Sequence, residues 1–589
     1  MERDIMRQLA EWKEDKDRKP LLITGVRQCG KTYVMKSFGE QYFEDVAYFN
    51  FEGNEEIHSV FSYNFDVKRI VDELGNLIRN KRIVPGKTLV IFDEIQACPR
   101  AITSLKYFCE NLRQLHIVCA GSLLGVAIKR ENVSFPVGKI DRMQMYPMSF
   151  SEFLRADGGE NLYRGLVGML QERELSDLYT VPLEKTLKLY YIVGGMPEAV
   201  SKWVKTHDFK KVEKIQDHIL EDYGSDFSKH APKHEVPKLG WIWESIPKQL
   251  AKENNKFIFS HVREGKRSKD LEDALVWLED AGLVYRLELV EKPELPLSFC
   301  ADATYFKVYM SDVGLLRRKS GISPRVIIQG AEEYQRFKGA LTENFVLTEL
   351  KHLGRRAYFW RSGNSAEVDF LIEDEGRIIP IEAKADVNTK AKSYTLFCKR
   401  YHPRLGFKFS MKNVGEHRVE NTLTYSVPLY LIWKLERYLQ IEDTWMVEEP
   451  LFKELWEYSE RELAGYMLEY IHRIEQLQSE LEPILHHEIE VDVNLDKRIR
   501  GEYQSLEEQI REDARRMKMR GHREPGRCSL YREVFVLSIL EAADHGFSAS
   551  WNGELDYNYW GGLEEARYRL TKYDSKREWE DLRTAVKTV

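Results

Sequence analysis

The chain has 589 residues and a mass of 69.3 kDa, too much for one hydrophobic core, and its length predicts about three or four domains. A formal net charge of −7 and a pI near 6.2 argue against a nucleic-acid surface over the whole chain, although they allow a local basic groove. Seven cysteines without metal-binding spacing indicate a reducing compartment, and no long uncharged apolar run predicts a membrane span, so we expect a cytoplasmic protein.

A phosphate-binding loop lies near the start of the chain. A complete G-x-x-x-x-G-K-T motif follows the apolar run 21–24, and its residues are Gly25, Val26, Arg27, Gln28, Cys29, Gly30, Lys31 and Thr32. In this motif, backbone N–H groups wrap the phosphates, the lysine reaches the β- and γ-phosphates and the threonine hydroxyl binds Mg²⁺. The strand before the motif and the helix expected after it, 33–38, favour a nucleotide site over a chance glycine-rich turn.

Acidic residues follow a second apolar run, 88–92. A buried parallel strand places Asp93 and Glu94 at its carboxyl end, where Asp93 is expected to hold Mg²⁺ and Glu94 to polarise the attacking water. This pair favours hydrolysis over nucleotide binding alone. A third apolar run, 115–121, ends at Ser122, which is either a sensor of the γ-phosphate or an ordinary strand-to-loop transition.

Strands and helices alternate over the first 150 or so residues, which predicts a parallel sheet covered on both faces. The expected strands are 20–24, 46–51, 88–93, 116–120 and 140–145. Basic residues near the turn-rich segment 134–139 are candidates for contacting a neighbouring subunit's γ-phosphate, with solvated loop charges as the alternative: Lys129, Arg130 and Arg142.

The middle of the chain, 155–325, has a mainly helical pattern. A sharp break at 194–197 separates two helices, and 282–289 alternates like a strand. Helices followed by a short strand pair indicate a winged-helix module, for which DNA binding and a linker role with a solvated basic loop weigh equally. The nearby basic residues are Lys256, Arg263, Lys266, Arg267 and Lys269.

A second group of polar residues follows. Glu343 lies in a helix expected over 341–350, Asp369 lies in an alternating strand, and Glu382 and Lys384 form an E-x-K pattern on the next strand. This is the arrangement of the PD-(D/E)xK nuclease fold. On one face of a hairpin the carboxylates can bind Mg²⁺, completed by Glu343, while Lys384 activates water or steadies the phosphate. The fold does not by itself imply cleavage, because many such domains only bind or assemble.

Several segments resemble a widespread group of prokaryotic AAA-type ATPases that carry a C-terminal domain of unknown function. These are the phosphate loop, 92–96, 120–122, 146–154, 194–198, 277–284 and 307–316, and the resemblance extends to about residue 435. It implies ATP binding and hydrolysis through Gly25, Gly30, Lys31, Thr32, Asp93 and Glu94. One departure is Lys139, where the family commonly has arginine after Gly138, although lysine keeps the charge.

We therefore predict an α/β multidomain protein. Its parts are a P-loop ATPase domain at 1–154, a helical lid and winged-helix-like region at 155–325, a PD-(D/E)xK nuclease-like domain at 326–436 and a mainly helical extension at 437–589. The extension has apolar positions at helical spacing over 451–481 and 503–519, which predicts antiparallel helices.

The leading interpretation is an ATPase whose nucleotide state controls a nuclease-like, DNA-binding module in prokaryotic defence or mobile-element control. The alternative is a nucleotide-switched assembly scaffold with a catalytically silent nuclease-like domain. A metabolic kinase is disfavoured because no acceptor-binding motif is apparent. The expected cofactors are ATP and Mg²⁺. Candidate partners are DNA or RNA, a protein bound by the C-terminal helices and further copies of the chain in a homo-oligomer, and no membrane is expected.

Overall fold

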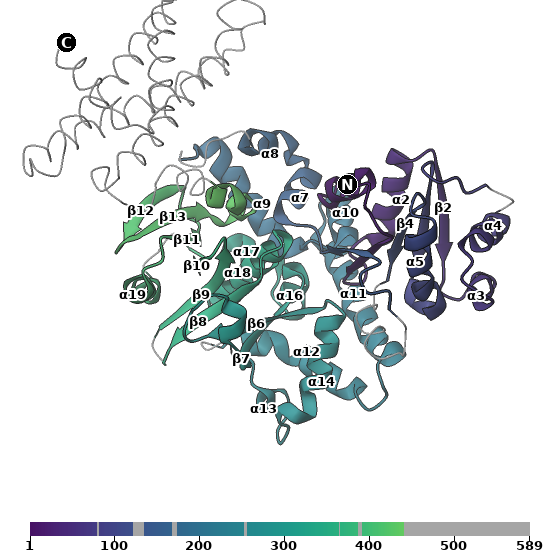
Figure 1. Ribbon diagram of the computed structural model, residues 1–589. Helices are drawn as coiled ribbons and strands as arrows, with labels where there is room; N and C mark the ends of the chain where they lie inside the picture. Colours follow the sequence, from purple (N-terminus) through teal and green to yellow (C-terminus); the bar gives the residue numbers. More distant parts are fainter. Residues whose placement is uncertain are drawn as a thin grey trace, which may run out of the picture. The chain divides into compact units, whose positions relative to one another are not determined.

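The computed structural model describes residues 1–78, 82–121, 135–167, 174–252, 256–330, 332–363, 366–386 and 391–440 (Figure 1). Some predictions fall outside these ranges: Ser122, Lys129, Arg130 and the helices expected over 451–481 and 503–519. Within the described ranges, no helix is long and apolar enough to cross a membrane.

A parallel sheet of five strands forms the N-terminal region, in the order β2-β3-β4-β1-β5. Its strands are β1 (Leu21–Gly25), β2 (Asp45–Asn50), β3 (Thr88–Asp93), β4 (His116–Ala120) and β5 (Asp141–Met145). All residues of β3 and β4 are buried, as expected for apolar runs covered on both faces. The five predicted strands are all present, with ends that move by one residue at most.

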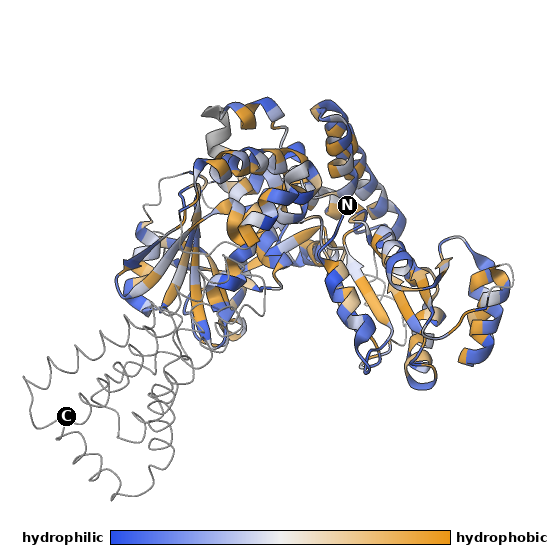
Figure 2. Ribbon diagram, turned by 90° about the horizontal axis from the view of Figure 1, so that it is seen from above, coloured by the Kyte–Doolittle hydropathy of each residue, from blue (hydrophilic) through white to orange (hydrophobic). Residues whose placement is uncertain are grey.

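Helices cover both faces of this sheet because the strand side chains alternate between two apolar layers. Leu89 and Ile91 pack with one set of helices, whereas Val90 and Phe92 pack with the other. The first set is α1 (Ile5–Glu14) and α2 (Lys31–Tyr42), and the second is α3 (Glu55–Ser62), α4 (Val67–Leu77) and α5 (Pro99–Asn111). The hydropathy colouring shows apolar strands between helices of mixed polarity (Figure 2).

A helical region follows the first sheet. Its elements include α7 (Phe150–Leu154), α8 (Glu160–Val167), α9 (Asp177–Val193), α10 (Pro197–Thr206), α11 (Phe209–His230), α12 (Val236–Leu250), α13 (Phe259–Val262) and α14 (Ser268–Asp280). One continuous cluster of buried apolar residues joins the first sheet to this region and to the second sheet. These parts of residues 1–440 therefore share a hydrophobic core.

A mixed sheet of eight strands forms the next layer, in the order β12-β13-β11-β10-β9-β8-β6-β7. Its strands are β6 (Val284–Val290), β7 (Ala301–Met310), β8 (Ala357–Ser362), β9 (Ala366–Asp374), β10 (Arg377–Ala383), β11 (Leu405–Ser410), β12 (Gly415–Val419) and β13 (Thr422–Pro428). The accompanying helices include α16 (Val313–Lys319), α17 (Pro324–Gln329), α18 (Glu332–His352) and α19 (Lys392–Tyr401).

The strand expected in a winged-helix module belongs to this second sheet. Strand β6 pairs antiparallel with β7 and parallel with β8, where Glu288 faces Tyr358. A lone hairpin of two strands is marginal in water, and pairing with β8 removes one of its open edges. Residues on both sides of the predicted division between 325 and 326 therefore contribute strands to the same sheet.

The turn at Gly195, between α9 and α10, packs closely against Met148 in the segment that follows β5. Gly195 accepts a hydrogen bond from the Met148 amide at 2.6 Å, and a Cβ at Gly195 would lie 2.0 Å from the Met148 carbonyl oxygen. Because both close atoms belong to the backbone, a side chain cannot be accommodated by a rotamer change.

We expect Gly195→Ala to destabilise the protein by about 1–3 kcal/mol, because the added methyl group overpacks this contact. Gly224→Ala is the matched control, since a Cβ there meets no atom within 4 Å, and it should stabilise α11 by about 0.5–1 kcal/mol. Thermal unfolding of the full chain measures both. Equal midpoints for the two variants would contradict the assigned contact.

Candidate functional site

The phosphate loop joins β1 to α2 through an unusual backbone. The φ angles of Gly25, Gln28 and Gly30 are 150°, 64° and 97°. A Cβ at Gly25 would lie 2.1 Å from the Met145 carbonyl oxygen on β5, so only glycine fits there. Helix α2 begins at Lys31, which places the loop at a helix N-terminus, where unpaired N–H groups and the helix dipole favour an anion.

Lys31 turns back over its own loop. Its ammonium donates hydrogen bonds to the carbonyl oxygens of Gly25 at 2.8 Å and Val26 at 2.9 Å, and the residue is 7% exposed. A buried ammonium needs hydrogen-bond partners, and here the loop backbone supplies them. The positive charge is therefore held within the loop.

Thr32, in α2, contacts Asp93 at the end of β3, although the strand before the loop, β1, is not a neighbour of β3. The Thr32 hydroxyl donates to Asp93 Oδ2 at 2.7 Å, and the Tyr48 hydroxyl donates to the same oxygen at 2.9 Å. Burial, together with the Asp93 charge, raises the pKa of Tyr48, so Tyr48 stays a donor at neutral pH. A hydroxyl and a carboxylate are oxygen ligands of the kind that Mg²⁺ prefers, so the residues present fit this cation.

Glu94 follows directly at the end of β3. It adopts a left-handed backbone with φ 49° and ψ 42°, which turns the chain out of the strand. The Gln96 side-chain amide donates a hydrogen bond to the Glu94 carboxylate. Sequence reasoning did not assign roles to Tyr48 or Gln96, although Gln96 lies within a segment, 92–96, that carries the family resemblance.

Helix α11 holds the loop from the helical region. Arg27 forms an ion pair with Asp226, the Gln28 amide donates to Asp222 Oδ2 at 2.7 Å, and the Tyr223 hydroxyl donates to the Arg27 carbonyl at 3.1 Å. These contacts were not predicted from the sequence. The available signal was the spacing of Asp222 and Asp226, which puts two carboxylates on one helix face.

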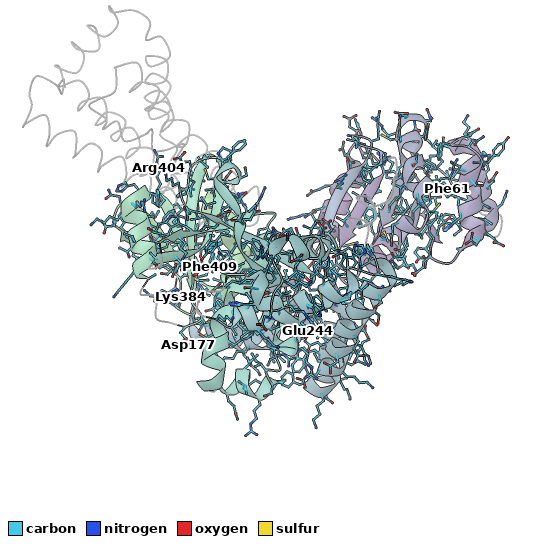
Figure 3. The ribbon with its side chains drawn as sticks, turned by 90° about the horizontal axis from the view of Figure 1, so that it is seen from below. Phe61, Asp177, Glu244, Lys384, Arg404 and Phe409 are labelled. Carbon is cyan, nitrogen blue, oxygen red and sulfur yellow. The ribbon has the colours of Figure 1, made fainter. Side chains whose placement is uncertain are left out.

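The second predicted cluster forms on β9 and β10. Lys384 Nζ lies 2.5 Å from Glu382 Oε1 and 3.9 Å from Asp369 Oδ2, and the Ala383 amide donates to Asp369 Oδ2 at 2.8 Å. Asp369 and Glu382 are 9% and 3% exposed. The Lys384 amide also donates to the Phe409 carbonyl at 2.8 Å, and both residues are labelled in Figure 3.

Glu343 approaches the same cluster from α18. Its Oε2 accepts hydrogen bonds from the Tyr309 hydroxyl at 2.5 Å and from Lys307 Nζ at 3.3 Å, and Lys307 also contacts Glu367 at 2.6 Å. Lys307 and Tyr309 come from β7, where alternation puts them on one face. They were missed because β7 was expected in another domain.

The charges of this cluster are only partly balanced. Burial raises the pKa of Asp369, and Glu382 raises it further while Lys384 opposes the shift. Burial likewise raises the pKa of Glu382 against the effect of Lys384. Glu382 Oε2 is buried and has no hydrogen-bond partner among the residues that the structure describes. Among the described residues, no group of three or more His, Cys, Asp and Glu side chains has a metal-binding arrangement, so the three acids do not form a ready-made three-ligand site.

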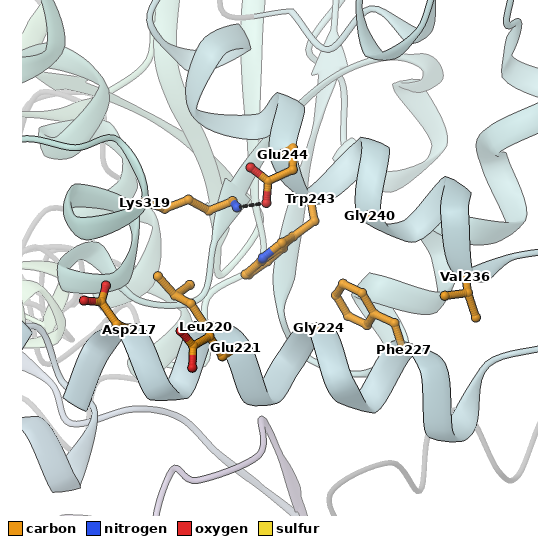
Figure 4. Close-up of a pocket in the computed structure, with 10 residues that line it drawn as sticks. All are labelled: Asp217, Leu220, Glu221, Gly224, Phe227, Val236, Gly240, Trp243, Glu244 and Lys319. Carbon is orange, nitrogen blue, oxygen red and sulfur yellow. Dashed lines mark hydrogen bonds and ion pairs between the residues drawn. The ribbon is translucent and has the colours of Figure 1, made fainter. Parts of the chain in front are cut away.

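A separate cleft of about 470 Å³ lies between α11 and α12 (Figure 4). Its walls include Phe227, Trp243 and an ion pair between Lys319 and Glu244 at 2.5 Å. None of the predicted site residues that the structure describes lines it. The contacts of α11 with the phosphate loop use other residues of that helix.

Helix α18 also contacts the end of the first domain. The Phe150 amide donates to Glu349 Oε1 at 2.9 Å, and His352 Nε2 lies 2.6 Å from the Pro147 carbonyl oxygen. The same helix therefore carries Glu343 in the second cluster and two residues bound to the chain that leaves β5.

Comparisons with known proteins agree with this architecture. Residues 17–154 match the family model of an AAA domain, AAA_14, residues 184–326 match a domain of unknown function, DUF8612, and residues 338–430 match another, DUF4143. No curated protein matches the chain. The chain thus contains an AAA-type P-loop ATPase domain followed by two domains of unknown function, as the sequence resemblance implied in outline.

Solved structures also align with parts of the chain. The ORC2 protein of Aeropyrum pernix aligns over 55% of this chain and 91% of its own, with 15% identity and a TM-score of 0.30. AMPPCP-bound DnaA from Aquifex aeolicus aligns over 46% of this chain and 86% of its own, with 13% identity and a TM-score of 0.22.

We expect Glu349 to make the stability of the protein depend on pH. Burial raises the pKa of its carboxyl from 4.5 to about 7, opposed by His352 and assisted by Glu152 and Asp4. The folded state then holds the proton more tightly than the unfolded state, so this contribution to stability is complete below pH 4.5 and is lost as the pH rises through about 7.

Glu349→Gln keeps the size and the acceptor but cannot titrate. The wild-type protein should therefore be more stable relative to this variant at pH 5 than at pH 8, as measured by denaturant unfolding. An identical stability difference at both pH values would contradict the raised pKa.

Proposed function

We propose that the N-terminal domain binds ATP with Mg²⁺ and hydrolyses it. The hydrogen bond between Thr32 and Asp93 at 2.7 Å carries this proposal, because it puts two oxygen ligands side by side at the start of α2. The loop backbone from Gly25 to Thr32 supplies the N–H groups for the phosphates, and the helix N-terminus favours their charge.

Each polar residue has a distinct role in this proposal. Lys31 exchanges the Gly25 and Val26 carbonyls for phosphate oxygens, and Thr32 and Asp93 hold the cation while Tyr48 orients Asp93. Bound Mg²⁺ would neutralise charge on the phosphate oxygens. Glu94 polarises the attacking water after Gln96 releases its carboxylate. Ser122, outside the described residues, stays the proposed γ-phosphate sensor.

Two substitutions separate binding from hydrolysis. Lys31→Ala should abolish ATP binding, whereas Glu94→Gln should keep it and slow phosphate release by about 100- to 10,000-fold. Lys68→Ala and Glu40→Gln alter exposed residues of the same domain and should match the wild type. Phosphate release and calorimetric titration with ATP and Mg²⁺ give the two readouts. Unchanged binding by Lys31→Ala would contradict the site.

A second function is favoured by the cluster on β9 and β10. Within the described part of the chain, buried Glu382 Oε2 has no hydrogen-bond partner, and a buried unpaired carboxylate oxygen is costly unless something binds it. We propose that Asp369 and Glu382, joined by Glu343 once the cation binds, would hold Mg²⁺ for phosphodiester cleavage of DNA or RNA. Lys384 then activates water or steadies the phosphate.

Nucleotide state is proposed to control this second cluster. Support comes from α18, which carries Glu343 and is hydrogen-bonded through Glu349 to the segment that leaves the ATPase sheet. The alternative, an assembly scaffold with a silent second cluster, uses the same connection to change assembly instead of cleavage.

Asp369→Asn should abolish Mg²⁺-dependent nucleic-acid cleavage and leave ATP hydrolysis unchanged, because the two clusters lie on different sheets. Glu416→Gln, an exposed position on β12, is the matched control. The assay uses labelled single- and double-stranded DNA and RNA with ATP and Mg²⁺. If wild-type protein cuts none of these substrates, cleavage is contradicted and the scaffold interpretation takes its place.

A further inference from the structure

Arg3 is buried against the phosphate loop although it lies outside the matched AAA domain, which begins at residue 17. Arginine is rarely buried unless it is paired, and Arg3 is only 6% exposed. Its guanidinium uses all three nitrogens: Nη1 donates to the Cys29 carbonyl at 2.9 Å, Nη2 to the Tyr146 carbonyl at 2.8 Å and Nε to Glu152 Oε1 at 3.0 Å.

The contact with Cys29 sets the direction of one loop amide. Cys29 O and the Gly30 N–H belong to the same planar trans peptide and point in opposite directions. Because Arg3 draws the carbonyl oxygen toward the protein interior, the Gly30 N–H is turned the other way. The residues before and after Cys29, Gln28 and Gly30, have φ angles of 64° and 97°, so the backbone here has an unusual conformation that needs support.

Arg3 is itself held rigidly. Glu152 Oε1 accepts from Arg3 and from the Asp4 amide at 2.6 Å, while Glu152 Oε2 accepts from the Ser149 amide at 2.9 Å. Burial acts to raise the pKa of Glu152, but the charge of Arg3 and the two backbone donors hold it below its ordinary value, so Glu152 is ionised. The planar fork of arginine suits three fixed acceptors, and lysine cannot reproduce it.

We propose that Arg3 is a positioning residue for nucleotide binding, which fixes the Cys29–Gly30 peptide so that the Gly30 N–H faces the phosphates. This inference rests on the proposed ATP site. Arg3 acts through the loop backbone and takes no part in the chemical step, so its loss should weaken nucleotide affinity more than it slows turnover at saturating ATP.

Simple anchoring of the N-terminus is the competing explanation, and the chain offers a control for it. Arg155 forms an ion pair with Asp4, the neighbour of Arg3, and among the described residues its polar contacts are with Glu2, Asp4 and Ser151 rather than with the loop. Arg155→Met should loosen the same N-terminal segment without releasing Cys29. Arg7→Met, at an exposed position of α1, controls for loss of a positive charge.

Calorimetric titration of the full chain with AMP-PNP and Mg²⁺ provides the test. Arg3→Met should weaken binding by about 10- to 100-fold, as expected for a lost charged hydrogen bond to a buried acceptor. Arg3→Lys should recover only part of the affinity, while Arg155→Met and Arg7→Met should bind within about threefold of the wild type. Thermal unfolding verifies that each variant is folded.

Equal loss in Arg3→Met and Arg155→Met, or wild-type affinity in Arg3→Met, would overturn the assignment of Arg3. If Arg3→Met does not fold, full affinity in Arg3→Lys would overturn it instead, because that variant keeps the charge but loses the fork. Absence of AMP-PNP binding by the wild type would overturn the proposed ATP site itself, so the two failures are distinguishable.

Discussion

The hydrogen bond between Thr32 and Asp93 depends on the strand order of the first sheet. Strands β1 and β3 are separated by β4, so the loop after β1 must lead into α2 across the end of β4 before Thr32 can reach Asp93. The buried apolar runs of β3 and β4 fix that spacing. The proposed nucleotide site depends on this contact, because it places a hydroxyl and a carboxylate oxygen side by side.

The segment that follows β5, 146–152, contacts several other parts of the described chain. Segment 146–152 binds Arg3 and through it the phosphate loop, contacts the turn at Gly195, and accepts or donates hydrogen bonds with two residues of α18. A helix rises about 1.5 Å per residue, so Glu343 and Glu349 lie about 9 Å apart along the α18 axis. The hydrogen bonds of this segment with α18 and those of Glu343 in the second cluster are therefore made by the same helix.

Local patterns predicted much of the molecule. The P-loop, the continuous apolar strands β3 and β4 and the E-x-K hairpin each depend on residues close together in sequence, and the structure brings Asp369, Glu382 and Lys384 together as the alternation required. The partners of these residues could not be predicted in the same way. Lys307, Tyr309 and Arg3 reach their sites through contacts between distant segments, and those contacts depend on topology.

The placement of β6 and β7 shows the same limit. Helices followed by two short strands indicate a winged-helix module, but the sequence does not reveal that β6 also pairs with β8 in the second sheet. With that pairing in place, Lys307 and Tyr309 of β7 donate hydrogen bonds to Glu343. From the sequence, Glu343 was expected only as a metal ligand.

A structure of the full chain with AMP-PNP and Mg²⁺ tests the central claim most directly. The account predicts that Lys31 leaves the carbonyl oxygens of Gly25 and Val26 for phosphate oxygens, and that Thr32 and Asp93 lie beside the cation. A nucleotide bound elsewhere, with Lys31 still on those two carbonyls, would contradict it.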